Sequence, residues 1–285
     1  MCGIVGLHLR EPSLEPRLGE LLTAMLGQVV ERGPDSAGVA VYGDPRLSPP
    51  GRTVVSLLGT SKAEVEAVLP GVQAYDADAT TVVHADVPSV AAALPGARVI
   101  GSGDGFAVLK GTGNPVALAE FFRLADVTGW QGVGHTRMAT ESAVTPEGAH
   151  PFSVGPGQCL VHNGSFANHA TIRRELRAQG VEFDSENDSE VGARFVARQL
   201  EQGADLEKAL KLLCERFDGF YTLLVSTGDS FAVVRDAIAC KPALVAETDA
   251  WVAMASEYRA LDVLPGIENA RIFEPEPEEV YVWRR

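Results

Sequence analysis

Apolar positions recur along the whole chain with two spacings, which alternate without a long linker. Residues 3–9 are a short apolar run that predicts a strand. Leucine, methionine and valine then return every three or four residues over 18–32, which predicts an amphipathic helix. A strand is expected over 39–42, and the stretch 44–52, rich in proline and glycine, is expected to be a loop.

The remaining elements divide into a middle part and a β-rich end. Residues 53–104 predict short strands and helices that form a small subdomain inserted into the main fold. Helices are expected at 115–124, 168–179, 188–200 and 206–216, and strands at 106–110, 132–135, 221–226, 231–235, 243–246, 251–255 and 280–283. Continuous alternation of helix and strand predicts one domain over residues 2–285.

Composition excludes several classes of partner. Acidic residues outnumber basic ones 38 to 24, a net charge of −14, so no basic surface for nucleic acid or anionic membranes is expected. No apolar run approaches the roughly 20 residues of a membrane helix, and residues 1–10 lack the layout of a signal peptide. We therefore expect a cytoplasmic protein. The four cysteines form no C-x-x-C pair or Cys/His cluster, so no metal site is expected.

Cys2 is the first candidate for chemistry. If Met1 is removed, the thiol and a free α-amine lie on the same residue. An α-amine has a pKa near 7.7 to 8.0, so it can accept the thiol proton and replace a separate histidine base. Position alone is weak evidence, because a cysteine at residue 2 is far more often part of a frayed terminus or a small buried hydrophobe. The apolar strand over 3–9 favours the functional interpretation, because it would hold the terminus in the core.

Four segments together identify a family. They are Met1-Cys-Gly-Ile-Val-Gly, Glu31-Arg-Gly-Pro-Asp-Ser-Ala-Gly, Gly134-His-Thr-Arg-Met-Ala-Thr and Val161-His-Asn-Gly. In this order they resemble the class II glutamine amidotransferases, whose glutaminase domains use an N-terminal cysteine. The resemblance covers most of the chain. It implies the Ntn-hydrolase fold, a four-layer αββα sandwich of the α+β class, with Cys2 at the end of a central strand.

The resemblance also assigns roles around the substrate, L-glutamine. Arg137 matches the arginine that grips the α-carboxylate, a task suited to a bidentate guanidinium. Asn163 and Gly164 match the oxyanion hole, although Asn-Gly alone would be read as a hairpin turn. Asp188 matches the aspartate that pairs with the ammonium. The alternative for Asp188 is a helix N-terminus, because Asn187 with a glutamate three residues later is a capping-box pattern.

Other matched positions are expected to support the site. The resemblance places Arg32 and Gly33 beside the nucleophile and Thr140 along the glutamine pocket, and gives His150 a supporting role. Met138 and Glu141 depart from the family pattern, so the loop over 138–149 is expected to close over glutamine differently. His135 and His162 are expected to orient neighbouring strands.

Four further sequence segments resemble one particular kind of subunit within this family. Thr136-Arg-Met-Ala-Thr-Glu-Ser, Glu186-Asn-Asp-Ser-Glu, Phe217-Asp-Gly-Phe-Tyr and Ala239-Cys-Lys-Pro-Ala most resemble the free-standing glutaminase-like subunit of glutamate synthase and N-methylglutamate synthase complexes. The resemblance implies synthase subunits as partners, no cofactor in this chain, and allows FMN and an iron–sulfur cluster in a partner. Two alternatives remain open: a catalytically silent assembly subunit, and an Ntn amidohydrolase that acts on another amide.

Overall fold

Two antiparallel sheets pack face to face and form the centre of the molecule. The computed structural model describes residues 1–49, 51–138 and 143–285. The larger sheet has the order β14-β12-β13-β1-β8-β2-β7. In that order its strands are Arg271–Phe273, Leu244–Glu247, Trp251–Ala255, Gly3–Leu9, Gln131–Arg137, Ser36–Tyr42 and Phe106–Thr112. The smaller sheet has the order β15-β11-β10-β9, with strands Tyr281–Arg284, Ser230–Arg235, Gly219–Ser226 and Cys159–Phe166.

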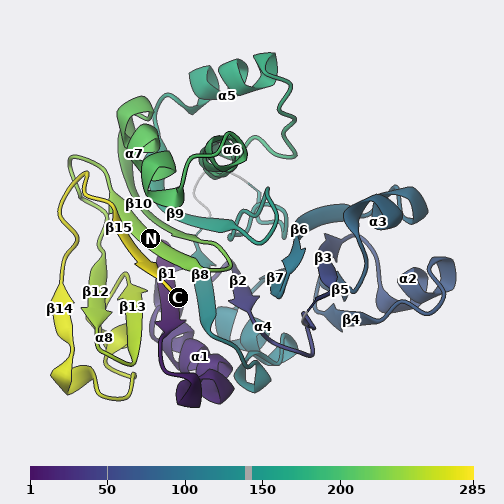
Figure 1. Ribbon diagram of the computed structural model, residues 1–285, viewed down its shortest axis with the longest axis horizontal. Coiled ribbons are helices and arrows are strands. Elements are labelled where there is room, and N and C mark those ends of the chain that lie inside the picture. The colour runs from purple at the N-terminus through teal and green to yellow at the C-terminus, as the bar shows by residue number, and fades with distance from the viewer. Residues whose placement is uncertain (50, 139–142) are drawn as a thin grey trace.

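Helices cover the outer face of each sheet, which completes four layers (Figure 1). On the larger sheet they are α1 (Leu18–Gln28), α4 (Pro115–Phe121) and α8 (Tyr258–Leu261). On the smaller sheet they are α5 (His169–Ala178), α6 (Asp188–Glu201) and α7 (Leu206–Arg216). This layering confirms the αββα sandwich of the α+β class that the resemblance implied.

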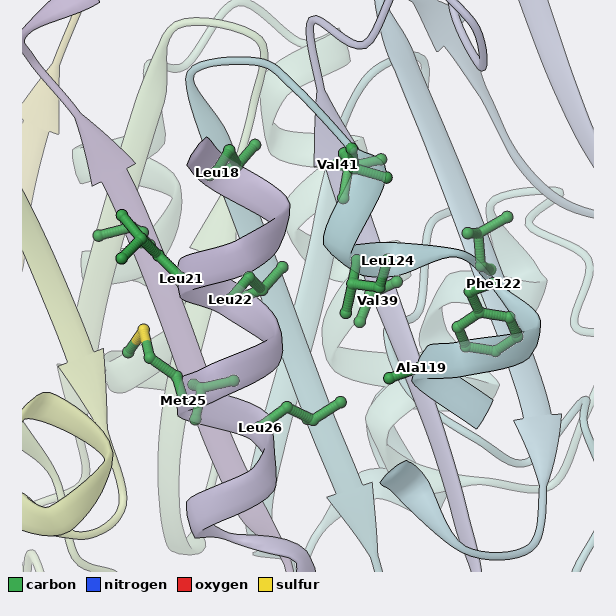
Figure 2. Close-up of a cluster of buried hydrophobic side chains, with 14 of the residues drawn as sticks. Leu18, Leu21, Leu22, Met25, Leu26, Val39, Val41, Ala119, Phe122 and Leu124 are labelled. Atoms are coloured by element: carbon green, nitrogen blue, oxygen red, sulfur yellow. The ribbon is translucent and has the colours of Figure 1, made fainter. Parts of the chain in front are cut away.

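The apolar face of α1 shows why these residues form a helix against the sheet. Leu18, Leu22, Met25 and Leu26 are buried at helical spacing, and Figure 2 shows them directed toward the strands. Each fully buried side chain of this size contributes roughly 1.5 to 3 kcal/mol of transfer free energy. The α-helix ends at Gln28 and a 3-10 turn follows over Val30–Arg32, so the predicted helix is right in place but four residues too long as an α-helix.

A third sheet occupies the stretch where a subdomain was expected. Its order is β4-β5-β3-β6, with strands Ala74–Ala77, Thr80–Val83, Thr53–Leu58 and Arg98–Asp104. The helices α2 (Lys62–Val68) and α3 (Val87–Ala93) pack on it through a separate apolar cluster that includes Val55, Val65 and Val90. In Figure 1 this unit lies on the side of β7. Whether it is a subdomain that can be separated stays a prediction.

Periodicity missed the shortest elements. β4, β14 and α8 have no more than four residues each, which is too few for a period to be recognised. Within the described residues, no helix is both long and apolar enough to cross a membrane.

Candidate active site

Cys2 lies at the end of the central strand β1, as the resemblance implied. β1 pairs with β8 on one side and with β13 on the other, and Gly3 is opposite Thr136. This register brings Cys2 next to the residue after β8. The backbone nitrogen of Met138 lies 3.4 Å from the Cys2 sulfur and can donate a hydrogen bond to it. A buried strand with partners on both sides therefore holds the thiol in place.

Two side chains converge on the backbone carbonyl of Cys2. Nε of Arg32 donates to it over 2.9 Å, and Nδ2 of Asn163 donates to it over 3.1 Å. The guanidinium of Arg32 is itself held by Glu257, with Nη1 2.8 Å from Oε1. Burial acts to raise the pKa of Glu257, but the hydrogen bond from Arg32 and the charge of Arg259 outweigh it and hold that pKa below its ordinary value. Cys2 is thus positioned through its main chain.

A buried histidine sets the orientation of the Asn163 amide. Nε2 of His135 lies 3.1 Å from Oδ1 of Asn163. Burial lowers the pKa of His135 to about 3, so the ring is neutral. Because Oδ1 can only accept, Nε2 of His135 must carry the proton, and the Asn163 amino group is directed toward Cys2 and Ser256. The structure therefore gives His135 a more specific task than the strand-orienting role expected from sequence.

Backbone geometry makes glycine necessary at two of the predicted positions. Gly164 has a φ of +135°, and a Cβ there would lie 1.9 Å from the carbonyl oxygen of Phe220 on β10. A Cβ on Gly33 would lie 2.5 to 2.6 Å from backbone atoms of Thr136 and Arg137. Both glycines allow a close approach of two backbones near Cys2, which no residue with a side chain would permit.

The predicted carboxylate-binding arginine lies at the end of β8. Arg137 is buried, and its Nη1 donates to the carbonyl of Ala143 over 3.2 Å. Gly148 lies close to the same guanidinium, because a Cβ there would be 3.3 Å from Nη1. The ring of His150 is buried 4.1 Å from the ring of His135, between centroids. The structure thus brings Arg137 and His150 to the same end of the sandwich as Cys2. Thr140 and Glu141 lie outside the described residues.

Asp188 is the first residue of α6, and only part of the predicted cap is formed. Asn187 is the N-cap and accepts a hydrogen bond from the Ser189 nitrogen. Glu190 does not bond back to Asn187; its carboxylate accepts from the Ser185 nitrogen and from Arg194. The prediction of a reciprocal capping box is therefore wrong, because backbone donors of the preceding loop compete for the Glu190 carboxylate.

The other carboxylate, that of Asp188, ties α6 to the strand that carries the oxyanion-hole candidates. Its Oδ2 accepts a hydrogen bond from the backbone nitrogen of Phe166 at the end of β9.

Sequence reasoning missed two residues of the site. Ser256 and Glu257 follow β13, and they bond to Asn163 and Arg32 respectively. They carry no recognisable motif, and they reach the site only because β13 is the neighbour of β1 in the sheet. The pairing of strands about 250 residues apart in sequence could not be read from either segment alone.

Comparisons with known proteins show which proteins this chain resembles. The family described as "Glutamine amidotransferase domain" matches residues 135–263. A protein named glutamine amidotransferase-like protein GlxB, from Rhizobium meliloti, is 47% identical over 99% of this chain and 98% of its own length. A putative glutamine amidotransferase from Methanothermobacter thermautotrophicus is 29% identical over 99% of both chains.

Solved structures show the same fold. Glutamine phosphoribosylpyrophosphate amidotransferase from B. subtilis superposes with a TM-score of 0.64 at 20% identity, over 99% of this chain. The present chain spans 49% of that protein.

Proposed function

Because this chain belongs to the class II glutamine amidotransferases, we propose that it hydrolyses L-glutamine to L-glutamate and ammonia through a thioester on Cys2. One observation carries the proposal: Arg32 and Asn163 both donate to the carbonyl of Cys2, which places a thiol at the end of a buried strand beside an amide donor. This arrangement suits acyl transfer, in which a positioned nucleophile must lie next to a group that stabilises an oxyanion.

The first half of the reaction uses the terminal amine. Removal of Met1 converts the Cys2 nitrogen into an α-amine, which accepts the proton of the thiol. The sulfur attacks the δ-carbonyl carbon of glutamine, and the negative charge forms on the carbonyl oxygen. Nδ2 of Asn163 and the backbone N–H of Gly164 are the proposed donors to that oxygen. The intermediate collapses, the amine returns its proton to the leaving nitrogen, and ammonia departs.

The second half regenerates the thiol. Water loses a proton to the Cys2 amine and attacks the thioester carbon, and the sulfur leaves as glutamate forms. Arg137 is the proposed partner of the substrate α-carboxylate and Asp188 that of its ammonium, while Thr140 is proposed to line the pocket. One N–H of the Asn163 amide lies 3.3 Å from Oγ of Ser256, so it must exchange this weak bond for the oxyanion.

Mass spectrometry tests the nucleophile directly. We expect the purified protein to lack Met1 and to gain one adduct, mapped to Cys2, after treatment with a diazoketone analogue of glutamine. Cys2→Ala should abolish both the adduct and glutamine hydrolysis. Cys240→Ala, which removes an exposed free thiol, is the matched control and should retain both. Full glutaminase activity in Cys2→Ala would refute the mechanism, and a retained Met1 without an adduct would favour the silent assembly subunit.

For the ammonia, we propose an acceptor on a partner subunit of glutamate synthase or N-methylglutamate synthase type, in which FMN and an iron–sulfur cluster would lie. The support is the likeness of four sequence segments to the free-standing glutaminase-like subunits of such complexes. Affinity purification from native cells should recover a flavoprotein with this chain, and adding that protein should couple glutamine hydrolysis to amination. Recovery of this chain without any flavoprotein would contradict the assignment.

A further inference from the structure

A polar cleft lies next to the segment 147–154 and does not include Cys2. It is small and partly open to solvent. Lys110, Glu147, Phe152, Ser153 and Glu190 line it, together with Arg98. The mechanism proposed above uses none of these side chains.

Lys110 occupies a position where the pattern of β7 calls for an apolar residue. Phe106 and Val108 precede it on the same face of the strand, and both are buried between the two sheets. Lys110 is only 2% exposed. The residue opposite it on β2 is Gly38, and a Cβ there would lie 3.1 Å from Cγ of Lys110 and 2.1 Å from the carbonyl oxygen of His150. The missing side chain at Gly38 therefore makes room for the lysine stem.

The amine of Lys110 forms no ion pair with a described residue, and the charges of Glu190 and Glu147 act on it only from beyond ion-pair distance. It lies 4.8 Å from the centre of the Phe152 ring, and no described carboxylate comes within ion-pair distance of it. Burial lowers the pKa of Lys110 to about 7. Because a buried cation without a paired anion costs several kcal/mol in general, a ligand anion beside Lys110 would favour the charged form of its amine.

Two further groups complete the site. Oγ of Ser153 is buried and has no hydrogen-bond partner among the described residues. Glu147 is half-buried, and no ion pair of its carboxylate occurs in the described ranges. Glu190, in contrast, is already committed to the nitrogens of Asp184 and Ser185. Arg98, which is exposed, donates to the backbone carbonyl of Asp184. The cleft therefore offers one buried cation and one hydroxyl on one hand, and one available carboxylate on the other.

We infer that this cleft binds a small α-amino acid, with its carboxylate on the Lys110 ammonium and the Ser153 hydroxyl and its ammonium on Glu147. A ligand with both charges matches the groups that have no partner, and the apolar ring of Phe152 leaves little space for a large side chain. The site is distinct from the one proposed for glutamine. It shares with it the segment 147–154, in which Gly148 contacts Arg137.

Calorimetric titration of the full-length protein with glycine tests the inference. We expect saturable binding that Lys110→Met weakens at least tenfold and that Glu147→Gln weakens by a similar factor. Lys241→Met is the matched control, because Lys241 also lies over an aromatic ring, that of Phe220 at 5.0 Å, but outside the cleft. Arg137→Met serves as the second control, since it removes the proposed carboxylate partner of glutamine. Lys241→Met should bind glycine as the wild type does, and Arg137→Met should retain the binding that Lys110→Met weakens.

Each outcome decides between sites. No binding of glycine to the wild type, or binding that Arg137→Met abolishes and Lys110→Met does not, would overturn the inference. Titration with acetate separates an amino-acid site from a simple anion site: acetate should bind at least tenfold more weakly than glycine, and equal affinities would overturn the role of Glu147. Thermal unfolding of Lys110→Met checks that the variant is folded. If Cys2 does not hydrolyse glutamine, we still expect the cleft to bind glycine. Failure of the proposed glutaminase function and failure of the amino-acid site can therefore be told apart.

Discussion

The imidazole of His135 holds the amide of Asn163 in a single orientation. Nε2 of the ring and Oδ1 of the amide are 3.1 Å apart, and the amide nitrogen on the other side lies 3.1 Å from the carbonyl oxygen of Cys2. β8 supplies the histidine and β9 supplies the asparagine, so the two sheets meet at this contact. A hydrogen-bond donor directed at the backbone of Cys2 is therefore built from both sheets of the sandwich.

His135→Phe should impair catalysis without removing any group that touches the substrate. The Asn163 amide would lose the partner that fixes its orientation, and we expect kcat for glutamine hydrolysis to fall by about 10- to 100-fold with a smaller change in KM. His135→Gln should restore part of kcat, because its amide can still donate to Oδ1. A loss of the same size in both variants would indicate a packing role instead.

Asn163→Ala should have a larger effect on the same step. Removal of one oxyanion-hole donor lowers kcat by roughly 10²- to 10³-fold in comparable sites. The double variant His135→Phe/Asn163→Ala should be no slower than Asn163→Ala alone, since the histidine acts through the asparagine. Additive losses in single-turnover measurements would contradict this coupling.

Arg32 and Glu257 should behave as a coupled pair. Glu257→Gln removes the charge that holds the guanidinium and should lower kcat by several-fold, while Arg32→Met should lower it further because the Cys2 carbonyl loses a donor. The rate of thioester formation measured in a double-mutant cycle should show an interaction free energy of about 0.5 to 3 kcal/mol. Glu20→Gln, which disrupts an exposed ion pair with Arg17, is the control and should leave the rate unchanged.

Gly164→Ala should destabilise the fold. The added Cβ would meet the Phe220 carbonyl at 1.9 Å, and the φ of +135° is unfavourable for alanine. We expect the free energy of unfolding in urea to decrease by about 3 kcal/mol or more. Gly228 is the control, because a Cβ there would meet no atom within 4 Å and its φ is not positive. Gly228→Ala should change the free energy of unfolding by no more than about 0.5 kcal/mol.

Acid should destabilise the protein through its buried histidines. Burial lowers the pKa of His135 to about 3 and that of His162 to about 4, and it lowers that of His150 as well. Below pH about 6.5 the unfolded chain binds protons at these rings and the folded chain does not, so stability is complete above that pH and is lost as the pH falls toward 4.

The dependence of the free energy of unfolding on pH tests this prediction. Each such histidine contributes up to about 1.4 kcal/mol per pH unit. Urea unfolding at pH 7, 6 and 5 should therefore show a steeper decline for the wild type than for His135→Gln. Parallel declines would show that the His135 ring is protonated in the folded state.

Local pattern was sufficient for most of the helices and strands of this protein, and the resemblance to a known family supplied the four layers. The apolar run of β1 and the helical spacing of Leu18, Leu22 and Met25 are properties of short segments, because burial of a strand or of one helix face is reflected in the local sequence. The four motifs also identified the family, and the structure brings Cys2, Arg137, Asn163 and Gly164 to one end of the sandwich as the motifs implied.

Only the tertiary structure decided which groups hold those residues in position. Ser256 and Glu257 reach the site through the pairing of β1 with β13, and His135 meets Asn163 across two sheets. The carboxylate of Glu190 accepts hydrogen bonds from backbone nitrogens of the preceding loop and does not complete the expected cap. Such contacts depend on register and packing between segments that are far apart in the chain, and a hydrogen-bonding side chain carries no periodic signal of the partner it will find.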